Sequence, residues 1–249
     1  MGLKGKIIYI LDNYILRFLG DQTYLKIKYK YKMKQKLNLN NPQTFNEKLQ
    51  WLKIHDRKDI YTTMVDKYEA KKYIADIIGQ EYIIPTLGIY EKFEDINFEE
   101  LPDKFVIKCT HDSGGIVICK DKSKFDYNNA KKRINKCLNR NFYYHGREWP
   151  YKNVKPRVIV EEFIGENLTD YRIYCFNGKA KYVYMYLNKF NDEGRPEPKN
   201  CNIYDMNWNL QEFHQNSLPT KEKYNKPKQL EEMKEIAEKL SRKYKIFKS

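Results

Sequence analysis

The sequence lacks the features that mark membrane-spanning, secreted or disulfide-bonded proteins. Its apolar runs fall far short of the roughly 20 residues that a helix needs to cross a bilayer. The basic start is not followed by an apolar core with a small-residue cleavage site, so no secretory signal is expected. The five cysteines are odd in number, form no Cys-x-x-Cys pair and stand among apolar residues, which favours buried, reduced thiols. These absences predict a cytoplasmic protein.

Motifs for nucleic-acid recognition are also missing, although the chain is strongly basic. The 47 Lys and Arg residues exceed the 33 Asp and Glu residues by 14 charges, and residues 1–36 hold nine basic residues against two Asp. Without a zinc-finger spacing or an aromatic RNA-binding signature, we expect no nucleic-acid partner. Two interpretations of the charge stay open. It serves a polyanionic partner such as an anionic membrane or a phosphorylated substrate, or it reflects a composition rich in Lys, Asn, Ile and Tyr, as A/T-rich genomes produce.

What is present is enough apolar sequence for a folded chain. Apolar residues make up 41% of the 249 residues and charged residues 32%, which suits one large domain or two small ones. For residues 25–36 the pattern allows either a polar helix or a short strand. Hydrophobic periodicity and turn signals predict helices at 6–20, 44–54, 66–78, 127–140 and 227–242, and strands at 104–109, 116–120, 157–164, 171–176, 180–187 and, as a pair, within 202–213.

The predicted helix at 6–20 is amphipathic. Ile7, Leu11, Ile15 and Leu19 fall on one of its faces. This face packs on the protein's own core or rests on an anionic membrane, with the basic run that follows adding electrostatic attraction. The second interpretation predicts peripheral contact with the inner face of the membrane.

Two lysines and a glycine-containing loop form a candidate phosphate site. Lys67 stands at the start of the predicted helix at 66–78, and Lys108 ends a strand just before the loop from His111 to Gly115. Lysine ammonium groups and unobstructed main-chain amides are the groups that bind phosphate oxygens. Simpler interpretations stay open. A lysine at a strand end can be a solvent-exposed side chain without a ligand, and two glycines in a hairpin can do no more than form its turn.

A candidate nucleoside site follows further along the chain. Glu161-Glu162-Phe163-Ile164 ends a predicted strand, where main-chain groups can contact an adenine edge while Phe163 and Ile164 flank the ring. Asp170 and Arg172 open the next strand. The simpler interpretation of the two adjacent glutamates is a solvated surface, and only the order of all these pieces gives them specificity.

That order resembles the ATP-grasp superfamily, which includes D-alanine ligases and biotin carboxylases, and more closely its teichuronopeptide-biosynthesis (TupA-like) branch. The resemblance covers roughly residues 38–242 and implies an α+β ATP-grasp fold with two α+β lobes that grip a nucleotide. It is carried by Asn41-Pro-Gln-Thr-Phe-Asn-Glu-Lys-Leu-Gln-Trp51, Val65-Asp-Lys-Tyr68, Lys108-Cys-Thr-His-Asp-Ser-Gly114, Gly146-Arg-Glu-Trp-Pro-Tyr151, Lys155-Pro-Arg157 and Asp170-Tyr-Arg172 with Cys175-Phe-Asn-Gly178.

The resemblance also implies roles for single residues. Lys67 and Lys108 would hold the α- and β-phosphates of ATP, and Arg157 and Arg172 would meet phosphate or an acyl-phosphate intermediate. The remaining nucleotide contacts are Ser113, Gly114 and Gly115 over the triphosphate, Glu161 with the Glu162, Phe163 and Ile164 backbone at adenine, and Asp170 at the ribose.

The sequence departs from the family at its end. Relatives continue into strands that carry an Asp and a Glu as Mg²⁺ ligands, whereas here no acid follows Glu238. Since Mg²⁺ needs oxygen ligands, we expect those ligands to be missing with the C-terminal strands. The metal ligands within the chain itself are unassigned, and the alternative is that Asp170, Asp205 or another acid substitutes. The expectation is a truncated copy that is catalytically defective.

The function expected from the resemblance is an ATP-dependent carboxylate–amine ligase of cell-surface polysaccharide or teichuronopeptide synthesis. Its partners would be ATP, Mg²⁺, a small-molecule or lipid-linked glycan carboxylate and an amine. A glycosyltransferase of the same glycans, which would want an Asp-x-Asp-type metal site, and a non-catalytic nucleotide-binding protein are the alternatives. The expected parts are a helical, basic segment at 1–60, an N-terminal lobe at 61–103, a lid subdomain at 104–164 and a C-terminal lobe at 165–249.

Overall fold

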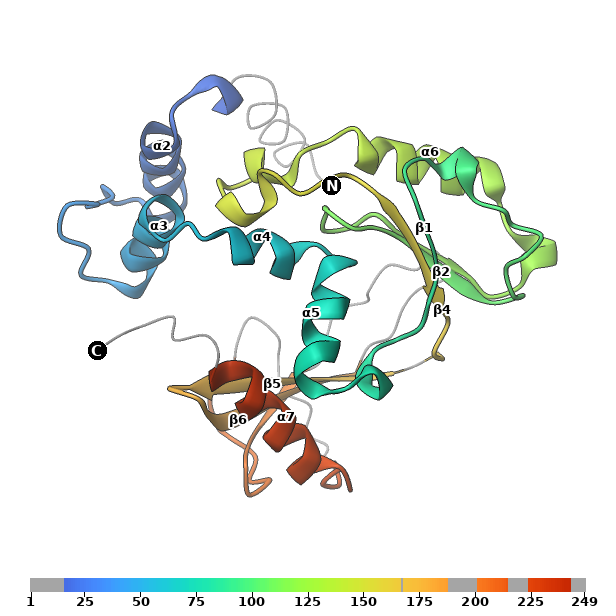
Figure 1. Cartoon of the computed structure of the whole chain (residues 1–249). Helices are drawn as coiled ribbons and strands as arrows, with labels where there is room; N and C mark the ends of the chain where they lie inside the picture. The colour runs from blue at the N-terminus through green and yellow to red at the C-terminus, as the bar shows by residue number, and fades with distance from the viewer. Residues whose placement is uncertain (1–15, 167, 188–200, 215–223, 243–249) are drawn as a thin grey trace. The chain divides into compact units, whose positions relative to one another are not determined.

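The computed structural model describes residues 16–166, 168–187, 201–214 and 224–242, and it divides the chain into two compact units. The first unit comprises Met1–Tyr73 and Pro85–Glu162, and the second comprises Ile74–Ile84 and Phe163–Ser249. Both units mix helices with antiparallel sheets (Figure 1), so the α+β prediction is confirmed.

The first unit begins with a helical part. It contains α2 (Asp21–Met33), α3 (Phe45–His55), α4 (Asp59–Val65) and the start of α5 (Glu69–Ile78). Thr44 and Glu47 form the predicted capping box at the start of α3, each side chain accepting from the other's main-chain amide. Residues 25–36 resolve as helix up to Met33. Of the predicted helix at 6–20, residues 6–15 lie outside the described residues, and Leu16–Phe18 form a 3-10 turn. Helix α4 was not expected from the sequence.

A four-stranded antiparallel sheet forms the rest of the first unit. Its order is β1-β4-β2-β3, with β1 (Thr86–Tyr90), β2 (Phe105–Cys109), β3 (Ile116–Cys119) and β4 (Val158–Glu162). The predicted hairpin is confirmed, because β2 and β3 pair from Phe105–Cys119 to Lys108–Ile116. Strand β4 ends two residues earlier than expected. Its neighbour β1 is preceded by Pro85, whose carbonyl accepts the last bond and which has no N–H to continue the ladder.

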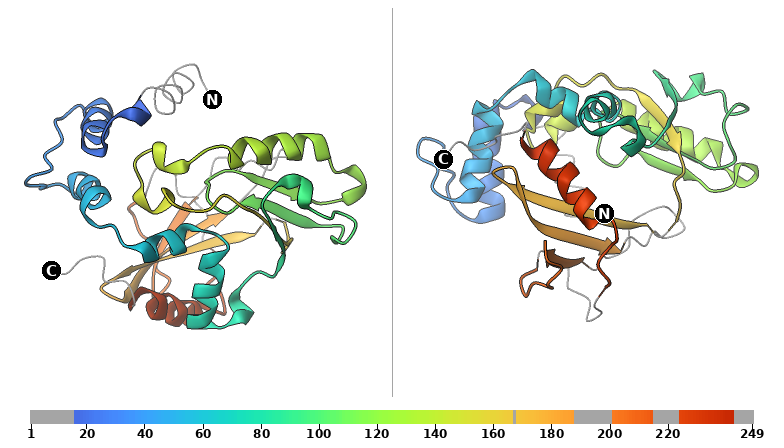
Figure 2. Two further views of the ribbon diagram at one scale, coloured as in Figure 1. Left: turned by 45° about the horizontal axis from the view of Figure 1, so that its top comes forward. Right: turned by 60° about the horizontal axis from the view of Figure 1, so that its bottom comes forward.

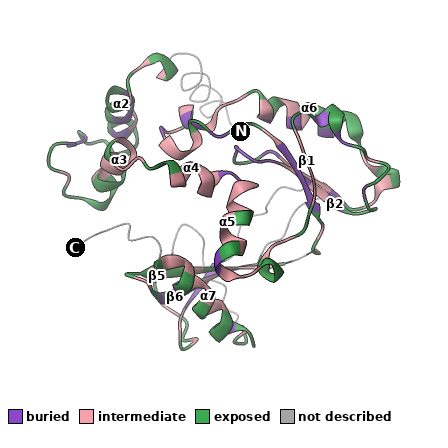
Figure 3. Cartoon of the chain, viewed as in Figure 1, coloured by how far each residue is buried: buried purple, intermediate pink, exposed green. Residues whose placement is uncertain are grey.

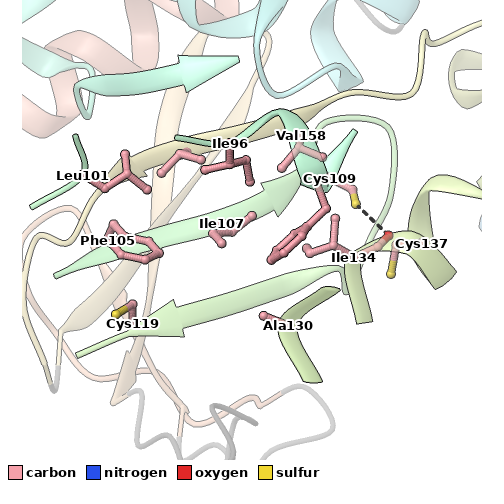
Figure 4. Close-up of a cluster of buried hydrophobic side chains, with 12 residues drawn as sticks. Ile96, Leu101, Phe105, Ile107, Cys109, Cys119, Ala130, Ile134, Cys137 and Val158 are labelled. Carbon is pink, nitrogen blue, oxygen red and sulfur yellow. Dashed lines mark hydrogen bonds between the residues drawn. The ribbon is translucent and has the colours of Figure 1, made fainter. Parts of the chain in front are cut away.

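One face of this sheet packs on helix α6 (Tyr127–Leu138). Phe105, Ile107 and Cys109 alternate with more exposed residues along β2, so their side chains share that face. They meet Ile134 and other apolar residues of α6 in a buried cluster (Figure 4). The opposite face therefore carries the intervening residues of β2 and β4, and the candidate site lies there.

The second unit combines a three-stranded antiparallel sheet with its own helix and with the later residues of α5, from Ile74 on. β5 (Thr169–Phe176), β6 (Lys179–Leu187) and β7 (Cys201–Asp205) follow in order, and α7 (Leu230–Arg242) lies along β5 and β6 (Figure 2, right). The predicted turn is confirmed: Asn177 and Gly178 have φ values of 51° and 76°, as a two-residue hairpin needs. Beyond β7 only an isolated bridge, Tyr204–Leu210, replaces the second strand expected within 202–213.

Short 3-10 turns connect these elements. The turns are Leu16–Phe18, Gln80–Tyr82, Phe93–Asp95, Lys122–Lys124, Phe142–Tyr144 and Trp149–Tyr151.

No helix in the described ranges is long and apolar enough to cross a membrane.

Candidate functional site

A buried glutamate between two lysines marks the polar face of the first unit's sheet. In the β2–β4 register Val106 is opposite Glu161 and Lys108 is opposite Ile159, so Lys108 and Glu161 point to the same side. Lys108 Nζ lies 2.5 Å from Glu161 Oε2. Lys71, from the first turn of α5, forms an ion pair with Oε1 of the same carboxylate. Three segments distant in sequence thus converge on one carboxylate.

The two lysines decide the ionisation of Glu161. Its side chain is only 4% exposed, and burial alone would raise the pKa of a carboxyl group. The hydrogen bonds and charges of Lys108 and Lys71 outweigh that effect and lower the pKa of Glu161 below its ordinary value. Two cations on one anion leave one positive charge in excess, which can serve a further anion at this face.

Lys67 stands between α4 and α5, and its side chain reaches the loop that follows β2. Its ammonium group donates to the carbonyl oxygen of Cys109 at 2.9 Å and to that of Asp112. Its own amide donates to the carbonyl of Thr110 at 3.1 Å. Burial lowers the pKa of Lys67. These contacts fix the path of the loop, and they place the positive charge of Lys67 against the loop's main chain.

Each of the two glycines in the loop is required for a different structural reason. Gly114 has a φ of +127°, which side-chain-bearing residues rarely adopt. A Cβ on Gly115 would lie 2.9 Å from Cys137 of α6 and 3.2 Å from the sulfur of Cys109, so only glycine fits. Within the described part of the chain the amides of Gly114 and Gly115 donate to no protein acceptor, whereas the Ser113 amide donates to Asp112 Oδ1 at 2.7 Å. The loop thus presents two unpaired amides.

Asp112 and His111 hold the loop on α6. Asp112 is fully buried and accepts from Arg140 Nε at 2.9 Å. His111 Nε2 lies 3.1 Å from the carbonyl of Cys137 and 3.2 Å from that of Arg140, at the C-terminal end of the helix. Burial lowers the pKa of His111, so a neutral imidazole that donates from Nε2 fits this position.

Arg157 is engaged by carboxylates rather than free. Its guanidinium lies 2.7 Å from Asp66 Oδ2 and 2.8 Å from Glu69 Oε1, and it stacks over the Tyr68 ring at 4.9 Å. Asp66 Oδ1 also accepts from the Tyr68 amide at 2.9 Å. The Asp66 side chain thus satisfies main-chain amides just before and at the start of α5, which begins at Glu69.

The other predicted residues lie at or beyond the end of β4. Glu162 is exposed, Phe163 is half-buried and Ile164 is 56% exposed. On β5, Arg172 forms an ion pair with Asp170 at 2.9 Å and lies over the Tyr186 ring at 4.5 Å. Phe163, Ile164, Asp170 and Arg172 belong to the second unit, whereas Glu162 ends the first. The predicted residues that the first unit brings together are Lys67, Lys108, Ser113, Gly114, Gly115, Glu161 and Arg157.

Sequence reasoning missed Lys71, Asp112 and Arg140. The available signal for Lys71 is its spacing of four residues from Lys67 on a predicted helix, which places both on one side. The spacing of Asp112 and Arg140 does not predict their ion pair, because it depends on how α6 packs against β2 and β3.

A Mg²⁺ site is not assembled by the described residues. Among them, no three side chains of His, Cys, Asp or Glu come together as metal ligands. In the first unit Asp66, Glu69 and Glu161 are neutralised by Arg157, Lys71 and Lys108. The described donor set therefore does not fit a resident metal.

Comparison with known proteins gives one family. The sequence profile described as TupA-like ATPgrasp matches residues 47–247, which is most of the chain. No curated protein and no solved structure matches significantly. The matched stretch contains every residue of the site described above.

Proposed function

The chain belongs to the TupA-like ATP-grasp family, and on that premise we propose that it is an ATP-dependent carboxylate–amine ligase whose triphosphate site is the polar face of the first unit. The family is one of ATP-binding, ligase-like proteins. The observation that carries the proposal is the buried Lys71–Glu161–Lys108 group beside a loop with two unpaired glycine amides.

Charge and hydrogen-bond capacity support phosphate as the ligand of this face. The excess positive charge on Lys71 and Lys108 attracts an anion, and glycine amides offer donors that no side chain obstructs. Lys67 adds a second positive charge beneath the loop, where burial keeps its field from being screened by water. Phosphate oxygens would accept from Lys108 and from the amides of Gly114 and Gly115.

The proposed chemistry is phosphoryl transfer followed by amide formation. A carboxylate oxygen attacks the γ-phosphorus of ATP, ADP leaves, and the amine then displaces phosphate from the acyl phosphate while losing a proton. The chain's own contribution is to hold the triphosphate and neutralise its charge so that a second anion can approach. Lys108 and the glycine amides hold it, while Lys67 shapes the loop that presents them.

Several finer assignments belong to the same proposal. Glu162, Phe163 and Ile164 would contact adenine, Asp170 the ribose, and Arg172 the acyl phosphate. Arg157 would act through Asp66 and Glu69 as a positioning residue for the start of α5. The substrates would be a glycan carboxylate, small or lipid-linked, and an amine, with the protein cytoplasmic and in peripheral contact with the membrane.

An isotope-transfer assay tests the reaction class. The full chain is incubated with ATP, magnesium, candidate amines and candidate sugar acids whose carboxylate oxygens carry ¹⁸O. A ligase that forms an acyl phosphate moves one labelled oxygen into the released inorganic phosphate for each amide made. Lys108→Ala should abolish most of this transfer, whereas Lys104→Ala, at an exposed position before β2, should retain it.

The outcome separates the candidate functions. Release of unlabelled phosphate while amide forms would contradict the acyl-phosphate route. Transfer of a sugar from a nucleotide sugar to the same acids, without ATP consumption, would favour the glycosyltransferase alternative instead.

A further inference from the structure

Helix α2 has one covered side and one side open to solvent. Tyr24, Leu25 and Tyr29 are buried in a small core with Leu37 and Leu39. Most of the other residues of α2 are exposed, as the green parts of α2 in Figure 3 show, while Asp21 and Lys28 are half-buried. Residues four apart in a helix lie on the same side, so Lys26 neighbours Lys30 and Ile27 neighbours Tyr31. We call this the α2 surface, and it consists of Lys26, Ile27, Lys30, Tyr31, Met33 and Lys34.

The α2 surface is positively charged without compensation. Residues 22–46 contain six lysines and no Asp or Glu. In the part of the chain that the structure describes, no carboxylate pairs with Lys26, Lys30 or Lys34, and the Lys34 ammonium lies 4.9 Å from the Tyr31 ring. A run of like charges on one helix costs stability unless a partner of opposite sign is present. The surface therefore suits an anionic partner.

Apolar side chains lie among these lysines. Ile27, Tyr31 and Met33 are 44%, 55% and 41% exposed. Nucleic acid needs the charge and gains little from Ile or Met, whereas the boundary between lipid headgroups and acyl chains accepts both. Lysine stems can lie along such a boundary with their ammonium groups among the phosphates. The combination favours an anionic bilayer over a nucleic acid.

The helix is firmly attached to the first unit. Arg147 is 1% exposed, donates to the carbonyls of Leu16 and Leu19 at 2.9 Å, and lies over the Tyr24 ring at 4.5 Å. Asp21 at the start of α2 pairs with Arg57 at 2.5 Å. A contact made by α2 would therefore hold the whole first unit at the same surface, and the helix need not fold or move to make it.

We propose that the α2 surface docks the protein on an anionic phospholipid bilayer, with the helix in the plane of the interface. The proposal rests on the first unit alone and does not depend on the proposed ligase activity. Each lysine near an anionic surface contributes about fivefold to binding. Removal of three lysines should therefore weaken binding about a hundredfold.

Vesicle sedimentation tests the proposal with the full chain. The vesicles are pure phosphatidylcholine or an equal mixture of phosphatidylcholine and phosphatidylglycerol. The test variant is Lys26→Gln with Lys30→Gln and Lys34→Gln. Its matched control removes the same charge from exposed positions of α6, by Lys131→Gln, Lys132→Gln and Lys136→Gln. Thermal melting followed by circular dichroism checks that both variants are folded.

The expected results differ between the variants. The natural chain should bind the anionic vesicles and not the neutral ones, with a partition coefficient that falls as salt is added. The α2 variant should lose about a hundredfold, and the α6 variant less than about threefold. Ile27→Gln with Met33→Gln should lower partitioning about tenfold and leave the salt dependence in place.

Three results would overturn the proposal. Equal losses in the α2 and α6 variants would show that net charge alone drives binding. Equal binding to neutral vesicles would remove the electrostatic argument. Binding of a single-stranded RNA with the same lysine dependence, while vesicles remain unbound, would assign the surface to nucleic acid. None of these results bears on ATP binding, so the proposed function is tested separately.

Discussion

Replacement of Glu161 by glutamine should destabilise the first unit strongly. The carboxylate is 4% exposed and compensates two lysines whose side chains are 18% and 24% exposed. Removal of one partner from a buried ion pair costs about 3–5 kcal/mol, because the remaining charge stays desolvated. Both lysines retain some access to water, so we expect a loss of about 3 kcal/mol in the free energy of unfolding.

Urea denaturation followed by circular dichroism measures this loss. Glu162→Gln is the matched control, since the neighbouring glutamate is exposed and should change stability by less than about 0.5 kcal/mol. The pH dependence provides a second test. The pKa of Glu161 is lowered in the folded protein, so its stabilisation is fully present above about pH 4.5 and is lost as the pH falls through the folded pKa. Equal stability of the two variants would refute the electrostatic account of this face.

Three further predictions concern the surroundings of the site. Gly115→Ala should cost about 1–3 kcal/mol by overpacking, since its Cβ would lie 2.9 Å from Cys137, and chemical denaturation should detect it. Burial lowers the pKa of His111, so below about pH 6.5 the unfolded chain takes up a proton that the folded one refuses. Stability should then fall by up to about 1.4 kcal/mol per pH unit until the folded pKa is reached, and His111→Gln should remove this slope in a pH series of melts. Arg147→Met should cost about 3 kcal/mol and expose Tyr24 to fluorescence quenchers, because three carbonyls lose a charged donor; unchanged quenching would contradict the anchoring of α2.

Local patterns predicted most of the elements, although they missed α4 and wrongly indicated a second strand within 202–213, whereas pairing between distant segments decided the site. The hairpin from residue 104 to 120 was predictable from two β-rich runs around glycines, and with it the position of Lys108 at a strand end. That Glu161 would share its face depends on the register between β2 and β4, which short-range patterns do not specify. The contribution of Lys71 depends in turn on how α5 packs on that sheet.

The loop shows the same limit in more detail. Its glycines and Lys67 were recognisable as candidates, but their spacing could not show that the Lys67 ammonium binds the carbonyls of Cys109 and Asp112. Lys67 lies in the turn between Asp66 and Glu69, the first residue of α5, and its own amide donates to the carbonyl of Thr110 in the loop. A charge expected to meet phosphate directly is, in the structure, part of the loop's support.

Calorimetric titration with ATP tests the central claim most directly, namely that the Lys108–Glu161 face binds the triphosphate. The natural chain, Lys108→Ala and the control Lys104→Ala are titrated with ATP and with GTP under conditions where melts show all three folded. Loss of a charge-assisted phosphate contact costs about 1.5–3 kcal/mol, so Lys108→Ala should bind ATP roughly ten- to a hundredfold more weakly. The natural chain and Lys104→Ala should bind ATP equally and in preference to GTP. Equal ATP affinity in the natural chain and Lys108→Ala would contradict the account.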